Sequence, residues 1–186
     1  MRFDASRLLW PRVLGALLLR VPTYRAVVLD QAASLQAGLV VVTTGVLEAV
    51  VRASVHGDAT VESTSIVYSV LAALIGWMVW SAIVFVVATR VFTRDFAVDL
   101  EFRAVTPVVG FAHSPSLLFG LAALPGVSEW AGLVLVVTLA WFVAALAAAV
   151  RGLTDAPLGR TLAITGSALL AHEALHQTLR LLGAMD

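Results

Sequence analysis

The sequence predicts an all-α fold: a polytopic membrane protein with five transmembrane helices, preceded by an N-terminal interfacial amphipathic helix. Of its 186 residues, 60% are hydrophobic and 13% are charged, and the mean hydropathy is +0.96. Soluble domains contain roughly 45–50% apolar and about 25% charged residues. Too few polar side chains remain to cover a water-soluble body, so the composition excludes the class of soluble enzymes.

The first 30 residues are expected to form a cytoplasmic, interfacial segment ahead of a membrane domain at 31–186. Pro11 lies at a position where helices commonly begin. The apolar residues that follow share one helix face, and Arg12 and Arg20 lie on the other; the apolar residues are Val13, Leu14, Leu17, Leu18 and Val21. A helix of this kind lies in the plane of the membrane interface. A plain tether is the alternative interpretation of the segment.

The spans follow from runs without Asp, Glu or Arg, which cover 31–47, 63–89, 104–128, 130–150 and 161–172. A helix needs roughly 20 apolar residues to cross the hydrocarbon core. The first run must therefore continue past Glu48 and the last past Glu173. The predicted spans are about 32–54, 64–89, 104–124, 130–150 and 161–182. Because proline removes a helical hydrogen bond, Pro115 is expected to kink the third span.

The arginines predict the orientation. A cytoplasmic N-terminus places ten of the twelve arginines inside and leaves Arg52 and Arg180 outside, which is the bias described by the positive-inside rule. The C-terminus then lies outside. The formal net charge is zero, which gives no reason to expect a nucleic-acid partner. The chain has no cysteine, which excludes disulfides and thiolate metal sites.

Small residues recur at four-residue spacing within the spans, a pattern that lets helix backbones approach closely in lipid. The groups are Ala72/Gly76, Gly110/Ser114, Ala140/Ala144/Ala148 and Ala163/Ser167/Ala171. They predict tight packing of the helix bundle and identify no ligand.

Several segments, in order, resemble bacterial members of the Yip domain family, the Ypt/Rab-interacting membrane proteins. The segments are Tyr24 to Gln36 around Asp30, Ala73-Leu-Ile-Gly-Trp77, Gly110-Phe-Ala-His-Ser-Pro-Ser-Leu-Leu118, Leu124-Pro-Gly126, and Trp141 through Ala148-Ala-Val-Arg-Gly152. The resemblance covers roughly residues 8–171 and implies five spans, a cytoplasmic N-terminus and a non-enzymatic membrane protein. The family's longer acidic N-terminal region is missing here, so no GTPase binding is inferred.

One motif suggests chemistry: His172-Glu173-Ala-Leu-His176 is an HExxH sequence. On a helix its two histidines share a face and can bind Zn²⁺, while the glutamate activates a bound water. The helix rise places Glu48 and His113 in the same outer half of the predicted bundle. A metal site of Glu48, His113, His172, Glu173 and His176 is therefore geometrically possible.

The alternative for the same residues is a structural polar network. In it, Glu48 pairs with Arg180 or His176 across two helices, and His113 serves as a satisfied partner of the kink at Pro115. Ionisable groups at this depth are costly and count as functional by default, which keeps both interpretations open.

We therefore predict a non-enzymatic integral membrane protein, either a membrane-organising scaffold or an accessory subunit. Its partners are the lipid bilayer and other membrane proteins or further copies of itself; no catalytic residue, cofactor or metal is assigned. The alternative is an intramembrane metal-binding protein or zinc hydrolase centred on the HEALH segment. The family resemblance and the Ala/Val/Arg-rich composition predict a bacterial inner (plasma) membrane.

Overall fold

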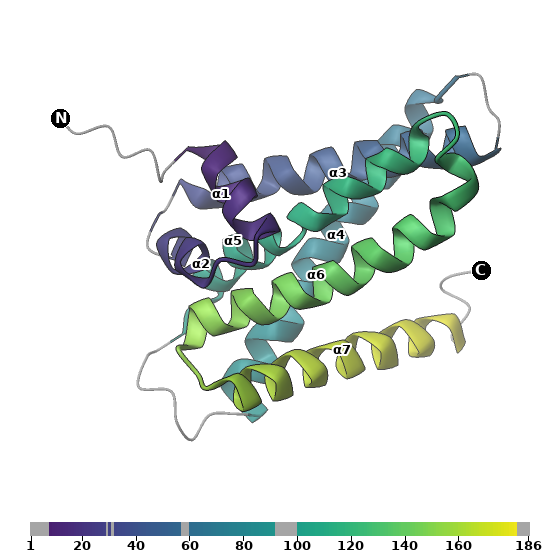
Figure 1. Cartoon of the computed structure of the whole chain (residues 1–186). Coiled ribbons are helices and arrows are strands. Elements are labelled where there is room, and N and C mark those ends of the chain that lie inside the picture. The colour runs from purple at the N-terminus through teal and green to yellow at the C-terminus, as the bar shows by residue number, and fades with distance from the viewer. Residues whose placement is uncertain (1–7, 29, 31, 57–59, 92–99, 182–186) are drawn as a thin grey trace.

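The computed structural model describes residues 8–28, 30, 32–56, 60–91 and 100–181, with 91 and 175–181 described by their backbone alone. All regular secondary structure in these ranges is helical (Figure 1). The elements in chain order are α1 (Leu9–Leu17), α2 (Val21–Val28), α3 (Ala33–His56), α4 (Ser63–Val86), the π-helical η2 (Val87–Val91), α5 (Phe102–Ala112), the 3₁₀-helical η4 (Ser114–Ala123) and η5 (Ser128–Trp130), α6 (Ala131–Thr154) and α7 (Leu158–Leu181).

Four helical segments among the described residues are long and apolar enough to cross a membrane. They are Ala33–His56, Ser63–Arg90, Phe102–Ala123 and Ser128–Thr154. These segments match the first four predicted spans, so the membrane class and the all-α fold are confirmed. The helix α7 follows as a continuous element of 24 residues but does not belong to this apolar set. A fifth span therefore stays a prediction.

The third segment changes helix type at the predicted kink. The helix α5 ends at Ala112, and the tighter η4 begins at Ser114 with Pro115 in its first turn. Proline has no N–H to donate to the carbonyl one turn earlier, so the α-helical ladder stops at this point. The imidazole of His113 contributes a bond here, because its Nδ1 lies 2.9 Å from the Val109 carbonyl oxygen.

Close crossings hold the long helices together. A Cβ atom at Gly45 of α3 would lie only 2.8 Å from the Cα of Val70 in α4. At Gly110 of α5, a Cβ atom would lie 2.7 Å from the side chain of Ala37 and 3.0 Å from the Trp77 indole nitrogen. The Trp77 indole also donates to the Thr106 carbonyl oxygen over 2.8 Å. Glycine is thus required where α3, α4 and α5 meet.

The N-terminal segment is folded differently from the single amphipathic helix that was predicted. Arg12 is 2% exposed, whereas Leu14 and Leu18 are 41% and 58% exposed. The prediction that Arg12 lies on the exposed polar face is therefore wrong. Its guanidinium turns inward because it forms an ion pair of 2.5 Å with Asp30 and donates to Gln36 over 2.9 Å.

The chain then turns sharply before α2. Helix α1 ends at Leu17, and Leu19 has a φ of +55°, a left-handed conformation that non-glycine residues rarely adopt. Tyr24 of α2 is fully buried, and its Cβ atom occupies the space beside Gly152 at the end of α6. In Figure 1, α1 and α2 cover the end of the molecule at which α5 begins and α6 ends.

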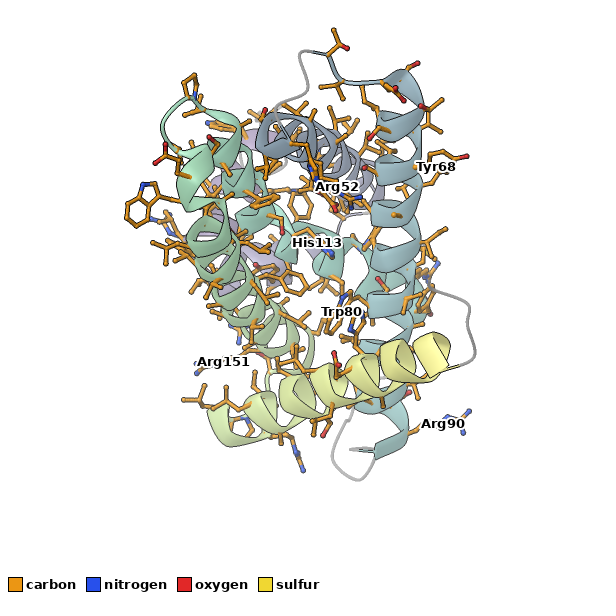
Figure 2. The ribbon with its side chains drawn as sticks, turned by 90° about the vertical axis from the view of Figure 1, so that its right-hand side faces the viewer. Arg52, Tyr68, Trp80, Arg90, His113 and Arg151 are labelled. Atoms are coloured by element: carbon orange, nitrogen blue, oxygen red, sulfur yellow. The ribbon has the colours of Figure 1, made fainter. Side chains whose placement is uncertain are left out.

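The last helix, α7, packs against α4 and α6 (Figures 1 and 2). Its buried residues follow one face of the helix at spacings of three and four; they are Thr161, Ile164, Thr165 and Ala168. On other faces Leu162 and Leu170 are 54% and 74% exposed. The helix therefore presents apolar side chains both to the bundle and away from it.

Candidate functional site: a cavity between four helical elements

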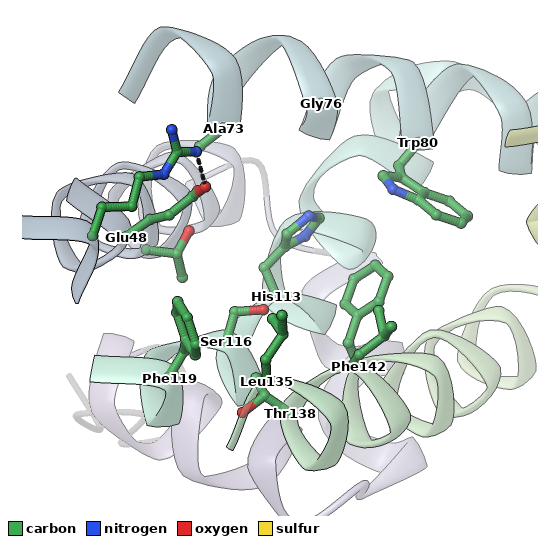
Figure 3. A pocket seen from close by; sticks show the side chains of 13 residues that line it. Glu48, Ala73, Gly76, Trp80, His113, Ser116, Phe119, Leu135, Thr138 and Phe142 are labelled. Atoms are coloured by element: carbon green, nitrogen blue, oxygen red, sulfur yellow. Dashed lines mark hydrogen bonds and ion pairs between the residues drawn. The ribbon is translucent and has the colours of Figure 1, made fainter. Parts of the chain in front are cut away.

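A cavity of about 490 Å³ lies between α3, α4, η4 and α6 (Figure 3). Most of its lining is apolar, with hydroxyl groups, an imidazole and one ion pair added. The lining residues are Thr44, Glu48, Arg52, Ala73, Gly76, Trp80, His113, Ser116, Phe119, Leu135, Thr138, Leu139 and Phe142. A volume in the range of about 300–1,000 Å³ with a few convergent polar groups is typical of small-molecule sites.

The cavity exists because two elements leave room for it. On α4, a Cβ atom at Gly76 would meet no other atom within 4 Å, so this glycine faces open space rather than a neighbouring helix. Small-residue spacing predicted Gly76 as a packing contact, and that prediction is wrong. On the opposite side, the tighter winding of η4 after Pro115 brings Ser116 and Phe119 to the cavity.

Glu48 lies at one end of the cavity, where it forms an ion pair with Arg52 (Figure 3). The two residues are one helical turn apart on α3, which is the spacing at which opposite charges meet on a helix surface. The side chain of Glu48 is 40% exposed and that of Arg52 is 61% exposed. Glu48 therefore has a partner on its own helix. The side chains of His176 and Arg180, its predicted partners, lie outside the described residues, so that pairing stays a prediction.

His113 lies deeper in the same cavity (Figure 3). Its ring contacts Phe142 of α6 with 4.9 Å between the ring centroids, and its Nδ1 is bonded to the Val109 carbonyl. The bond to Val109 agrees with the interpretation of His113 as a partner of the helix break. Its second ring nitrogen, Nε2, remains a polar atom on a predominantly apolar wall.

Within the described part of the HExxH segment, His172 approaches the cavity by stacking on Trp80, which lines it. His172 stacks on the Trp80 ring with 4.3 Å between centroids and an interplanar angle of 11°. Trp80 in turn makes an edge contact with Phe142, at 5.6 Å between ring centroids. Glu173 is exposed. The side chain of His176 lies outside the described residues.

The predicted metal residues thus divide into two sets. The structure brings Glu48 and His113 to one cavity, and it places His172 on the tryptophan that lines it. Among the side chains that are described, no three His, Asp or Glu residues are grouped so that they could hold a metal ion. Because the His176 side chain is outside this set, a zinc site at the HEALH segment stays a prediction.

Arg52 is the residue that sequence reasoning missed. It lines the apolar cavity and also two polar cavities beside the α3–α4 connection, of about 410 and 950 Å³. These two cavities are lined mainly by polar residues, among them His56, Thr60, Glu62, Thr64, Ser65 and Tyr68. The signal in the sequence was the spacing of Glu48 and Arg52, which predicts an ion pair near the end of the first span.

Comparison with known proteins adds no identity: no family model, curated protein or solved structure matches this chain. The resemblance to the Yip domain family accordingly stays a prediction from the quoted segments.

Proposed function

We propose that this chain is a non-enzymatic integral membrane protein that acts as a membrane-organising scaffold or accessory subunit. The observation that carries the proposal is the uncovered surface of α4, the span Ser63–Arg90. Only 17% of its apolar window is buried inside the chain, against 50% for Phe102–Ala123. A surface this apolar requires lipid or another membrane protein against it.

The uncovered side chains of α4 form one stripe along the helix. Exposed large residues recur at spacings of three and four, namely Tyr68, Leu71, Ile75, Met78 and, after two further turns, Val86. Ala72 and Ala82 lie on the same side and are also exposed. Small and large apolar residues together provide a surface on which a second transmembrane helix packs closely.

For the membrane topology we propose five spans with a cytoplasmic N-terminus and an outer C-terminus, in a bacterial inner membrane. Arginines at one end of the bundle support this orientation. Arg90 and Arg151 are labelled at the lower end of Figure 2 and Arg52 towards the upper end. Arg25 joins the lower group through its ion pair with Asp155. An arginine-rich end lies in the cytoplasm under the positive-inside rule.

The test is a native mass spectrum of the protein extracted with its surrounding lipid, combined with a photo-crosslinking residue at Ile75. Ile75 is 64% exposed on α4, and Val136 is 63% exposed on α6, which makes the latter a matched control. We expect a second polypeptide or a second copy in the spectrum, crosslinked at Ile75 and not at Val136. A single chain that carries one zinc ion would overturn the proposal in favour of the metal-dependent alternative.

A further inference from the structure

We propose that the cavity between α3, α4, η4 and α6 binds one zwitterionic phospholipid, with an acyl chain inside it and the headgroup phosphate on Arg52. The inference rests on the membrane location proposed above, and it holds whether or not the chain has a protein partner.

The apolar wall suits a hydrocarbon chain. Aromatic and aliphatic side chains from three elements line the cavity: Phe119 from η4, Leu135 and Phe142 from α6, and Trp80 from α4. The absence of a side chain at Gly76 leaves open space on the α4 side. In Figure 2, Trp80 and His113 are labelled in the space between the ribbons of α4 and α6. An acyl chain buries its CH₂ groups here at about 0.8 kcal/mol each.

The polar end suits a phosphate. Arg52 lines the apolar cavity and both polar cavities. It therefore lies at the boundary where the acyl chain of a bound lipid would join its headgroup. Glu48 accepts from Nη2 of Arg52 and leaves further guanidinium N–H donors in the planar fork. Arginine binds phosphate through paired, charge-assisted hydrogen bonds, which gives the contact its geometry.

The charges around Arg52 select the kind of headgroup. Among the described residues that line these cavities, Glu48 and Glu62 bring two negative charges to the one positive charge of Arg52. A headgroup with only negative charge is repelled by this excess. A headgroup that adds an ammonium group to the phosphate places its cation beside a carboxylate. We therefore assign the site to phosphatidylethanolamine-type lipids rather than to phosphatidylglycerol.

The experiment is a lipid titration of the full chain in detergent, followed by native mass spectrometry. The probes are palmitoyl-oleoyl phosphatidylethanolamine and palmitoyl-oleoyl phosphatidylglycerol, which share their chains and differ in the headgroup. We expect one molecule of the first to bind, and the second to bind about tenfold more weakly. Equal binding of both lipids, or no saturable binding of either, overturns the inference.

Variants locate the site. Gly76→Leu places a side chain in the cavity, and Arg52→Gln removes the positive charge; each is expected to weaken binding about tenfold or more. Gly166→Leu is the matched control, because a Cβ atom at Gly166 of α7 also meets nothing within 4 Å but lies outside the cavity lining. Circular dichroism and thermal unfolding confirm that each variant is folded, and Arg52→Lys tests whether charge alone restores binding.

The outcomes separate this inference from the proposed function. A single chain that binds phosphatidylethanolamine supports the lipid site although no protein partner is found. A chain that has a protein partner but whose lipid binding is unchanged in folded Gly76→Leu and Arg52→Gln overturns the lipid site alone.

Discussion

Arg12 of α1 is buried to 2% exposure and forms an ion pair with Asp30, which stands eighteen positions later, between α2 and α3. The same guanidinium donates to Gln36 in the first turn of α3. One buried cation thus joins the N-terminal helices to the first membrane span. Because such a charge is costly to bury without its partners, this ion pair is expected to be a sensitive point of the fold.

Replacing Arg12 with Met removes the ion pair between Arg12 and Asp30, whose side chains are only 2% and 16% exposed. We expect the free energy of unfolding to fall by about 3–5 kcal/mol, measured by denaturation in detergent micelles. Arg25→Met is the control, because the Arg25–Asp155 pair is 52% and 72% exposed. It is expected to cost less than about 1 kcal/mol. Equal losses in the two variants would contradict the prediction.

The crossing of α3 and α4 predicts a strong effect at Gly45. An added Cβ atom would lie 2.8 Å from the Val70 Cα and 3.0 Å from the Ser69 carbonyl oxygen, and backbone atoms cannot move aside cheaply. Gly45→Ala is therefore expected to lower the free energy of unfolding by about 1–3 kcal/mol. Gly76→Ala enters open space, so it is expected to be neutral or to gain up to about 1 kcal/mol of helix propensity. Thermal unfolding of the two variants tests the contrast.

Ser114 offers a test in the opposite direction. Its hydroxyl is fully buried and has no hydrogen-bond partner among the described residues, so the fold carries the cost of its desolvation. Ser114→Ala is expected to raise the free energy of unfolding by about 1 kcal/mol. The hydroxyl of Ser81 is equally buried but donates to the Trp77 carbonyl over 2.8 Å. Ser81→Ala is therefore expected to lower the free energy of unfolding by about 1 kcal/mol. A lower free energy of unfolding in both variants would contradict the prediction for Ser114.

Tyr24 makes the fold sensitive to alkaline pH. Burial raises the pKa of the Tyr24 hydroxyl above its ordinary value of about 10, since the phenolate is poorly solvated inside the chain. The folded state then holds this proton more tightly than the unfolded state. The resulting contribution to stability is complete below pH 10 and is lost as the pH rises above it. The pKa of tyrosine in the unfolded chain is about 10. Between about pH 9 and pH 11, the Tyr24→Phe variant is therefore expected to lose less free energy of unfolding than the unchanged protein, as measured by chemical denaturation at each pH.

The number of spans can be measured directly, because the chain has no native cysteine. Single cysteines at Thr60, Thr154 and Asp186 report the connection between α3 and α4, the end of α6 and the C-terminus. With five spans, we expect an impermeant maleimide to label positions 60 and 186 in intact cells, and position 154 only after permeabilisation. Labelling of 186 together with 154 would mean that α7 does not cross the membrane.

The extent of four spans could be predicted from sequence because it depends on one local quantity, the length of a run without charges. The first span, for example, was expected at 32–54 and extends from Ala33 to His56. Arg12 could not be placed this way, since its burial depends on Asp30 and Gln36 rather than on its own helix. The contacts of Arg12 with distant residues determine which face of α1 turns inward. Helical periodicity alone cannot predict such contacts.

The candidate site was predicted only in part for a similar reason. Glu48 and His113 were recognised because polar groups inside a span are costly. The same four-residue pattern that singled out Gly110 also singled out Gly76, yet the first lies against Ala37 and Trp77 while the second faces a cavity. The spacing of small residues shows where a helix surface has little side-chain bulk. Whether another helix or a cavity lies against that position depends on the packing of the whole bundle.

The manner in which α7 is attached has a consequence for the dynamics of the molecule. Its main contacts are with α4, η2 and α6, and among its described side chains only Ile164 and Ala168 belong to the buried apolar core. The turn before it begins at Asp155, whose φ of +49° already breaks the helical path of α6. Such an element opens and closes as a cooperative unit of its own, and the free energy of this local opening is lower than that of global unfolding. Backbone amides of α7 are therefore expected to exchange with deuterium before those of α3 and α5, while the remaining helices keep their protection.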